Sequence, residues 1–179
     1  MRNHLAGKIS LGGILTALAL LFLYAGALLP TGTAALAAVA GLFPAVCFLF
    51  AGWGGGILTY VAAALLGFAL LPNRMCLYLF VLFFGYYGLV KVAAETVRNR
   101  VLSWAIRFAV FNAALLAVFL LLPALIGLPF PETMDRTVVT VLTWLILNAV
   151  FLLYDIGLSR LLDYFRKRIV PLLNKKVFK

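Results

Sequence analysis

The chain is poor in charged residues and in the side chains that most often carry catalysis. Charged residues make up 11% of its 179 residues, whereas a soluble globular domain carries about a quarter. Five residues are acidic and one is a histidine, His4. A lone histidine leaves no material for a histidine-based metal site or a Ser–His dyad. Five scattered carboxylates are a poor basis for a Mg²⁺-dependent lipid transferase. An ordinary soluble domain and these enzyme classes are therefore excluded.

Short catalytic motifs are also missing. The chain has no Gly-x-Ser-x-Gly nucleophile motif and no phosphate-binding loop of the Walker type. The glycine-rich segment 52–56 lacks the lysine that would hold phosphates, so we predict a tight turn between helices there. The two cysteines, Cys47 and Cys76, lie in or beside apolar stretches, which favours buried thiols, although a disulfide is also compatible with the sequence. We predict a protein that is not an enzyme and that holds no metal or cofactor.

Long apolar runs dominate what remains. Hydrophobic residues make up 66% of the chain, and the mean hydropathy is +1.15. These residues come in runs rather than in alternation, which favours membrane helices over barrel strands. A bilayer core of about 30 Å needs about 20 apolar residues per helix. We therefore predict an all-α polytopic membrane protein that forms one domain over residues 1–179. The six predicted spans are 9–29, 33–51, 54–71, 75–95, 101–126 and 137–158.

The cations are distributed unevenly between the gaps that separate these spans. If the amino terminus is cytoplasmic, only Arg74 and Arg136 lie outside. The other thirteen of the 15 cations lie inside: Arg2, Lys8, Lys91, Arg98, Arg100, Arg107, Arg160, Arg166, Lys167, Arg168, Lys175, Lys176 and Lys179. Positively charged loops remain cytoplasmic, so we predict that both termini are cytoplasmic, which requires an even number of spans. The expected localisation is the cell membrane, as a multi-pass protein of the bacterial cytoplasmic membrane.

The carboxyl-terminal segment 159–179 has its own pattern. Apolar residues recur at helical spacing opposite Arg160, Arg166 and Lys167. This pattern predicts a basic amphipathic helix on the cytoplasmic surface, where anionic lipid headgroups attract Lys and Arg. A surface that docks another protein is the alternative. The net charge of +10 is accordingly interpreted as a membrane-facing charge, not as a nucleic-acid footprint.

Polar side chains inside the spans are few. Asp155 falls near the inner end of the last span, at the depth of Lys91 and Arg107, and an intramembrane carboxylate normally pairs with a cation. We therefore predict an ion pair among these residues, with a proton or ion relay as the alternative. Asn112 and Asn148 fall at similar depth in the last two spans. Their amides can join the two helices or contact a ligand.

The first span carries small residues at four-residue spacing, including Gly13 and Ala17, which permit close approach of another helix. Together with about six short spans and the opening stretch 8–18, this resembles the substrate-binding S component of energy-coupling factor (ECF) transporters. The resemblance implies uptake of a vitamin-like small molecule, with a separate transmembrane module and ATPases as partners. It implies docking through Gly13 and Ala17. The ligand-contacting residues then expected are Tyr60, Tyr78, Asn112, Trp144 and Asn148.

A second function fits the same pattern. The rod-shape protein MreD also has about six short spans and cytoplasmic termini, and such a protein is a non-catalytic membrane scaffold or assembly factor. Its basic inner face would hold partner proteins. The two functions differ in the outer half of the helix bundle, because a binding protein needs a cavity there and a scaffold does not.

Overall fold

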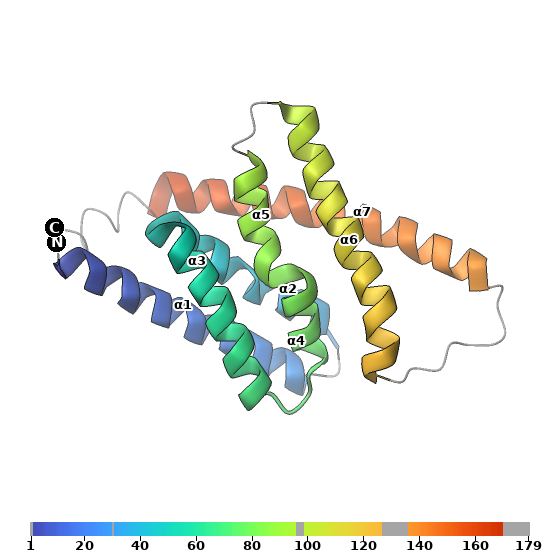
Figure 1. The fold of residues 1–179 in the computed structure, drawn as a ribbon, viewed down its shortest axis with the longest axis horizontal. Helices are drawn as coiled ribbons and strands as arrows, with labels where there is room; N and C mark the ends of the chain where they lie inside the picture. Colours follow the sequence, from blue (N-terminus) through green and yellow to red (C-terminus); the bar gives the residue numbers. More distant parts are fainter. Residues whose placement is uncertain (1, 30, 96–98, 127–135, 170–179) are drawn as a thin grey trace.

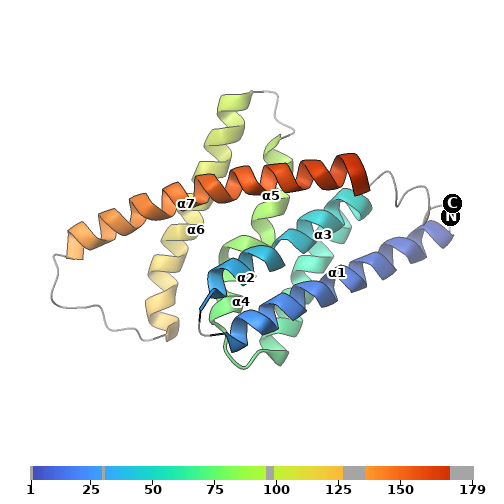
Figure 2. The same ribbon diagram turned by 180° about the vertical axis from the view of Figure 1, so that it is seen from behind.

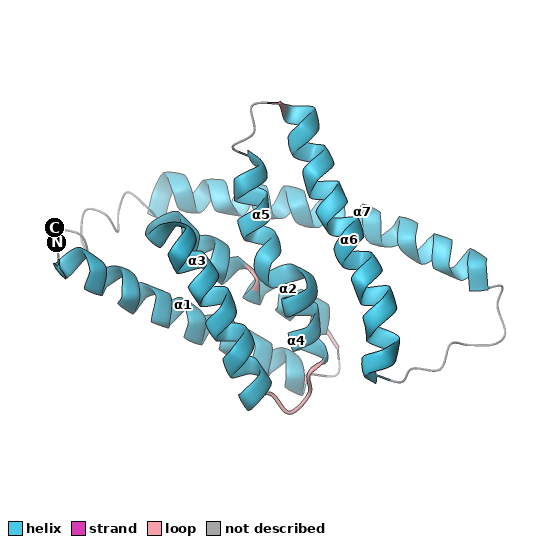
Figure 3. Cartoon of the chain, in the orientation of Figure 1, coloured by secondary structure: helices cyan, strands magenta, loops and turns pink. Residues whose placement is uncertain are grey.

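The computed structural model describes residues 2–29, 31–95, 99–126 and 136–169. Helices make up the regular structure of these residues (Figure 3), which confirms the all-α prediction for this part of the chain. The elements are α1 (Arg2–Leu28), α2 (Thr33–Ala40), α3 (Leu42–Leu70), α4 (Met75–Leu79), the π-helical turn η1 (Phe80–Phe84), α5 (Gly85–Glu95), α6 (Arg100–Ile126), α7 (Arg136–Tyr164) and the π-helical turn η2 (Phe165–Ile169).

Five helical stretches of the described residues are long and apolar enough to cross a membrane. They are Ala6–Leu28, Thr33–Leu70, Met75–Glu95, Val101–Val118 and Val141–Arg168. Four of them correspond to single predicted spans. The predicted spans 33–51 and 54–71 fall together in one stretch of 38 residues.

That long stretch is interrupted twice. The predicted span 33–51 is divided, because α2 ends at Ala40 and α3 begins at Leu42. Pro44 explains the break, since the proline ring clashes with the carbonyl four residues earlier, here that of Ala40. The second interruption lies inside α3, where Gly52 has φ 76° and ψ −167°, a backbone conformation that is open essentially to glycine alone. The glycine-rich segment predicted as a turn therefore does redirect the helix.

The bend at Gly52 brings the two halves of α3 against each other. A Cβ atom built on Gly56 would lie 3.0 Å from the Cβ of Phe48 and 3.1 Å from the carbonyl oxygen of Pro44. Residues 48 and 56 lie symmetrically about Gly52. The chain thus folds back on itself, and Figures 1 and 2 both show the two halves of α3 diverging from one bend.

The helices form two crossing layers. The second half of α3, α4 with α5, and α6 lie in the front layer of Figure 1. The first half of α3, α2 and α7 lie behind them, and the view from behind in Figure 2 brings these helices and α1 to the front. The amino-terminal helix α1 packs mainly against α3 and α2, while α5 packs against α3 and α6.

Exposure in this molecule is the inverse of that in a soluble protein. Large apolar side chains are exposed on the outer faces of the long helices, among them Ile9, Leu58, Leu65, Val101 and Leu153. The buried polar and charged side chains of the described residues are Thr16, Thr59, Lys91, Ser103, Arg107 and Asp155. An apolar exterior with polar groups inside is what a hydrocarbon solvent selects. The structure thus supports the assignment to a membrane.

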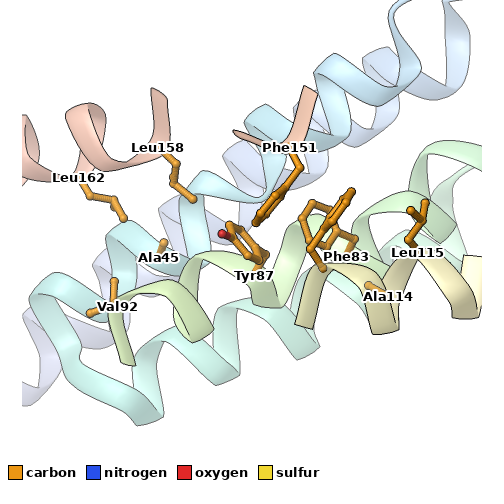
Figure 4. Close-up of a cluster of buried hydrophobic side chains, with 10 residues drawn as sticks. Ala45, Phe83, Tyr87, Val92, Ala114, Leu115, Phe151, Leu158 and Leu162 are labelled. Atoms are coloured by element: carbon orange, nitrogen blue, oxygen red, sulfur yellow. The ribbon is translucent and has the colours of Figure 1, made fainter. Parts of the chain in front are cut away.

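The interior is divided between two main clusters. One joins α1, α2, the second half of α3 and α4 through small and aromatic side chains, including Ala19, Ala37, Ala63 and Phe80. The other joins α3, η1, α5, α6 and α7. Figure 4 shows this second cluster, in which Phe151 of α7 reaches toward Tyr87 and Phe83.

The last helix is longer than the predicted span 137–158. It continues without a break through Tyr164 and then through η2 to Ile169. Leu158 and Leu162 are buried against the second cluster, whereas Arg160, Arg166 and Lys167 are exposed. The first half of the segment predicted as a separate amphipathic helix is therefore an extension of α7. Residues 170–179, the rest of that segment, lie outside the described residues.

Candidate functional site

Asp155 is the centre of a buried charged cluster. Its Oδ1 accepts hydrogen bonds from Lys91 Nζ at 2.5 Å and from the Tyr87 hydroxyl at 2.6 Å. Its Oδ2 accepts one from Arg107 Nη1 at 2.7 Å. The structure therefore brings together all three residues of the predicted ion pair. It adds Tyr87, which sequence reasoning missed, although its position four residues before Lys91 places it on the same face of a helix.

Each helix contributes to this cluster in a definite way. Tyr87 and Lys91 come from α5, Arg107 from α6 and Asp155 from α7. The guanidinium of Arg107 is held by its own helix, because Nε donates to the Ser103 carbonyl at 3.3 Å and Nη2 to the Ser103 hydroxyl at 3.4 Å. It also lies 4.4 Å from the centre of the Trp104 ring, a cation–π contact.

The charges of the cluster are balanced in pairs. Lys91 and Asp155 are essentially inaccessible to solvent, at 0% and 1% exposure. Lys91 also lies 3.6 Å from Glu95, whose side chain is 32% exposed. Two cations thus face two carboxylates, and both oxygens of Asp155 are used. The hydrogen bonds of the cluster join α5, α6 and α7, and we therefore interpret the cluster as a structural clamp between these helices.

The two intramembrane asparagines also join helices. Asn112 Nδ2 donates to Asn148 Oδ1 at 3.3 Å, which links α6 to α7. Each amide is further used by its own helix, since Asn112 Nδ2 donates to the Phe108 carbonyl and Asn148 Nδ2 to the Trp144 carbonyl, both at 2.9 Å. The amides therefore join the two helices, which is the first of the two roles predicted from their similar depth in the last two spans.

A π-helical turn interrupts the apolar stretch Met75–Glu95. In η1 (Phe80–Phe84) the backbone hydrogen bonds join residues five apart in the chain, where an α-helix joins residues four apart. Two tyrosine hydroxyls donate to carbonyls of this turn: Tyr60 to the Val81 oxygen at 3.0 Å and Tyr86 to the Leu82 oxygen at 2.9 Å. Turns of this kind occur frequently at functional sites. Tyr60, predicted to contact a ligand, is instead a partner of this turn.

Phe83 and Phe84, the last two residues of this turn, border a cavity of about 210 Å³. We call it the aromatic cavity. Its walls are Ala34, Leu79, Phe83, Phe84, Phe111, Ala114, Leu115, Val118, Leu147, Val150, Phe151 and Tyr154. These residues belong to α2, α4, η1, α6 and α7, so the cavity lies between the fourth, fifth and sixth predicted spans.

The rings around the aromatic cavity hold one another in place. Phe111 and Phe151 stack with centroids 4.2 Å apart and planes at 12°. Phe84 meets Tyr154 edge to face at 5.3 Å, and Phe83 meets Phe111 in the same way at 5.4 Å. Such contacts are favourable beyond simple burial. Because the rings are mutually fixed, the walls resist collapse into the space.

Tyr154 is the polar exception in this wall. Its hydroxyl is buried, and it has no hydrogen-bond partner among the described residues. A buried hydroxyl without a partner costs about 1–3 kcal/mol.

The five residues predicted to contact a ligand do not meet in the aromatic cavity. Tyr60 packs with the first apolar cluster, and Tyr78 lies beside Phe68 with ring centroids 6.4 Å apart. Trp144 packs against the second cluster near the asparagine pair. None of the five is a wall residue of the cavity. Sequence reasoning sought polar and amphipathic side chains, whereas the cavity is built from phenylalanines and aliphatic residues.

A second hollow lies between α1 and the second half of α3. It has a volume of about 560 Å³, and small residues form much of its lining, including Gly12, Gly13, Ala17, Gly54 and Gly55. Gly13 and Ala17 are exposed, and no atom lies within 4 Å of a Cβ built on Gly13. The face that the resemblance assigns to docking is therefore open.

Among the described residues, no group of three or more histidine, cysteine, aspartate or glutamate side chains is placed to hold a metal ion. Both cysteines are buried and free. Comparison with protein families, with curated proteins and with solved structures finds no match to this chain.

Proposed function

We propose that this chain is the substrate-binding membrane subunit of a small-molecule uptake transporter, similar to the S component of ECF transporters. The observation that carries the proposal is the position of the aromatic cavity. It lies between the fourth, fifth and sixth predicted spans, beyond the charged cluster that clamps the inner ends of the same helices. A binding subunit needs a hollow of this kind, since ligand sites are concave and mostly apolar.

The proposal includes six spans with both termini in the cytoplasm of a bacterial cell. The stretch Thr33–Leu70 supports six, because 38 helical residues measure roughly 57 Å at 1.5 Å per residue, far more than one crossing of a core of about 30 Å. The bend at Gly52 divides it into two lengths that each fit one crossing. The start of α1, the bend in α3, the end of α5 and the start of α6 then lie on one side of the molecule (Figure 1).

The open face of α1 is the proposed docking surface for the transmembrane module that works with the ATPases. Gly13 and Ala17 allow the backbone of a partner helix to approach closely, which is how small residues promote association in a bilayer. The exposed cations Arg160, Arg166 and Lys167 would contact anionic lipids on the cytoplasmic side. The ligand and the partner thus occupy different parts of the molecule.

The test is the substitution Gly13→Leu, followed by affinity purification from the native membrane. We expect the wild-type chain to copurify with a membrane subunit and an ATPase pair, and Gly13→Leu to lose them, because the leucine side chain keeps the partner backbone at a distance. Gly13 is exposed, and no atom of the chain lies within 4 Å of a Cβ built there, so we expect folding to be unchanged.

Gly157→Leu is the matched control. Gly157 is also exposed on a long apolar helix, and no atom lies within 4 Å of a Cβ built there. It should keep the partners that Gly13→Leu loses. If the wild-type chain copurifies with no ATPase, or if both variants lose their partners equally, the transporter proposal is wrong.

A membrane scaffold or assembly protein of the MreD type is the second candidate. The observation that favours it is the absence of the five predicted ligand residues from the aromatic cavity, since a polar vitamin would find few hydrogen bonds there. Recovery of cell-wall or cytoskeletal proteins in the same purification, in place of ATPases, would support the scaffold.

A further inference from the structure

We propose that the aromatic cavity binds an uncharged single-ring aromatic group, either a free molecule or the ring of a larger one. This inference rests on the proposed function, because it names the ligand class of the same subunit. It is carried by the size of the cavity, by its wall chemistry and by the π-helical turn that shapes it.

Size sets the scale of the ligand. An apolar cavity of about 150 Å³ accepts benzene, and the aromatic cavity has about 210 Å³. A six-membered ring with one or two small substituents therefore fits, whereas a fused cofactor or a nucleoside does not.

Wall chemistry sets the class. Four phenylalanine rings from η1, α6 and α7 line the space: Phe83, Phe84, Phe111 and Phe151. A ring ligand can continue their edge-to-face and stacked contacts, while a linear alkyl chain cannot. Among the residues that the structure describes, no charged side chain lines the cavity. A charged ligand would lose its hydration without replacement.

The π-helical turn shows that the cavity is built into the fold. Phe83 and Phe84, which line the cavity, both belong to η1, and π-helical turns inside α-helices are rare and occur frequently at functional sites. The turn is stabilised from outside the cavity by the hydroxyls of Tyr60 and Tyr86. Gly85 makes room for this, because a Cβ there would lie 2.6 Å from the Tyr60 ring.

The experiment uses the purified full-length chain in detergent and ¹⁹F NMR with three probes: 4-fluorotoluene, 1-fluorohexane and 4-fluorobenzoate. We expect saturable binding of 4-fluorotoluene, binding of 1-fluorohexane weaker by about three- to tenfold, and none of 4-fluorobenzoate. Equal binding of the ring and the linear probe would overturn the ring assignment, and tighter binding of 4-fluorobenzoate would overturn the uncharged class.

Filling the cavity locates the site. Ala114→Leu places extra volume at a buried wall position of α6, and it should abolish saturable binding. Ala113→Leu is the control, because Ala113 is the neighbour of Ala114 on the same helix and is exposed. This variant should bind the probe like the wild type, and it reports how much of the signal comes from partition of the probe into micelles. Should Ala114→Leu fail to fold, Val118→Phe fills the half-buried side of the cavity instead. Saturable binding that persists in a folded filled variant would refute the site.

Tyr154→Phe tests the ligand class from another side. Removal of its hydroxyl should leave the affinity for 4-fluorotoluene unchanged, and a loss of tenfold or more would mean that a polar contact, not the ring, carries binding. These measurements need no transport partner. Failure of ring binding with retention of the Gly13-dependent complex would therefore contradict this inference alone, and the reverse result would contradict the proposed function alone.

Discussion

At the scale of the residue, the charged cluster shows how a bilayer protein accommodates ionised groups. A charge inside a membrane is costly unless it is paired and hydrogen-bonded. Asp155 meets this condition with three donors, from Tyr87, Lys91 and Arg107. Removal of one partner would leave the others buried and unbalanced, which makes the carboxylate the most sensitive member.

We predict that Asp155→Asn destabilises the folded chain by about 3–5 kcal/mol, the cost of breaking a buried pair from one side. The asparagine keeps the size of the side chain but leaves Lys91 and Arg107 without their shared anion. The measurement is thermal or chemical unfolding in detergent, with membrane insertion checked separately and expected to be intact.

Asp163→Asn is the matched control for this change. Asp163 lies on the same helix, is exposed and undergoes the same loss of charge, so its effect should stay within about 0.5 kcal/mol. A similar loss of stability in both variants would show that net charge, and not the buried pairing, is responsible.

At the scale of the element, α3 illustrates how glycine and proline divide an apolar run. Pro44 breaks the helix at Gly41, and Gly52 reverses it with a positive φ. Nearby glycines have other roles. Gly56 permits the contact between the two halves of α3, since a Cβ there would meet Phe48 and Leu89.

Gly52→Ala should destabilise the chain by about 1–3 kcal/mol, because alanine is strained in that backbone conformation. Stability to heat in detergent and the yield of folded protein are the measurements. Gly54→Ala should be neutral or slightly stabilising, since Gly54 is exposed and has open space around it. If the two variants behave alike, the turn at Gly52 is not required.

At the scale of the whole molecule, two crossing layers expose large apolar side chains and bury the charges of Lys91, Arg107 and Asp155. The clamp at Asp155 holds one end of α5, α6 and α7, and the aromatic cavity lies between η1, α6 and α7 farther along the same helices. Such a division leaves one end of the bundle rigid and provides space in its middle.

The topology predicts opposite labelling of two single-cysteine variants in intact cells. With Cys47 and Cys76 replaced, Thr133→Cys should react with an impermeant thiol reagent from outside, and Asn174→Cys only after the membrane is opened. The reason is the distribution of thirteen cations against two. Labelling of both positions from the same side would rule out six spans with cytoplasmic termini.

The sequence by itself determined the all-α class, most helix bounds and the turn at the glycine-rich segment. It could do so because these depend on local properties: runs of apolar residues, and the backbone preferences of glycine and proline. The depth of Asp155, Lys91 and Arg107 along their spans was likewise sufficient to place them near one another, since antiparallel helices bring equal depths together.

Only the tertiary structure decided how the rings are arranged. The π-helical turn leaves no signature in the apolar run 75–95, because it depends on Tyr60 and Gly85 meeting across two helices. The aromatic cavity depends in turn on the way α7 crosses α6, which brings Phe151 onto Phe111. Phenylalanines look alike along a membrane helix. Packing between segments that are far apart in the chain decides which phenylalanines border a cavity. This packing cannot be predicted from the local sequence.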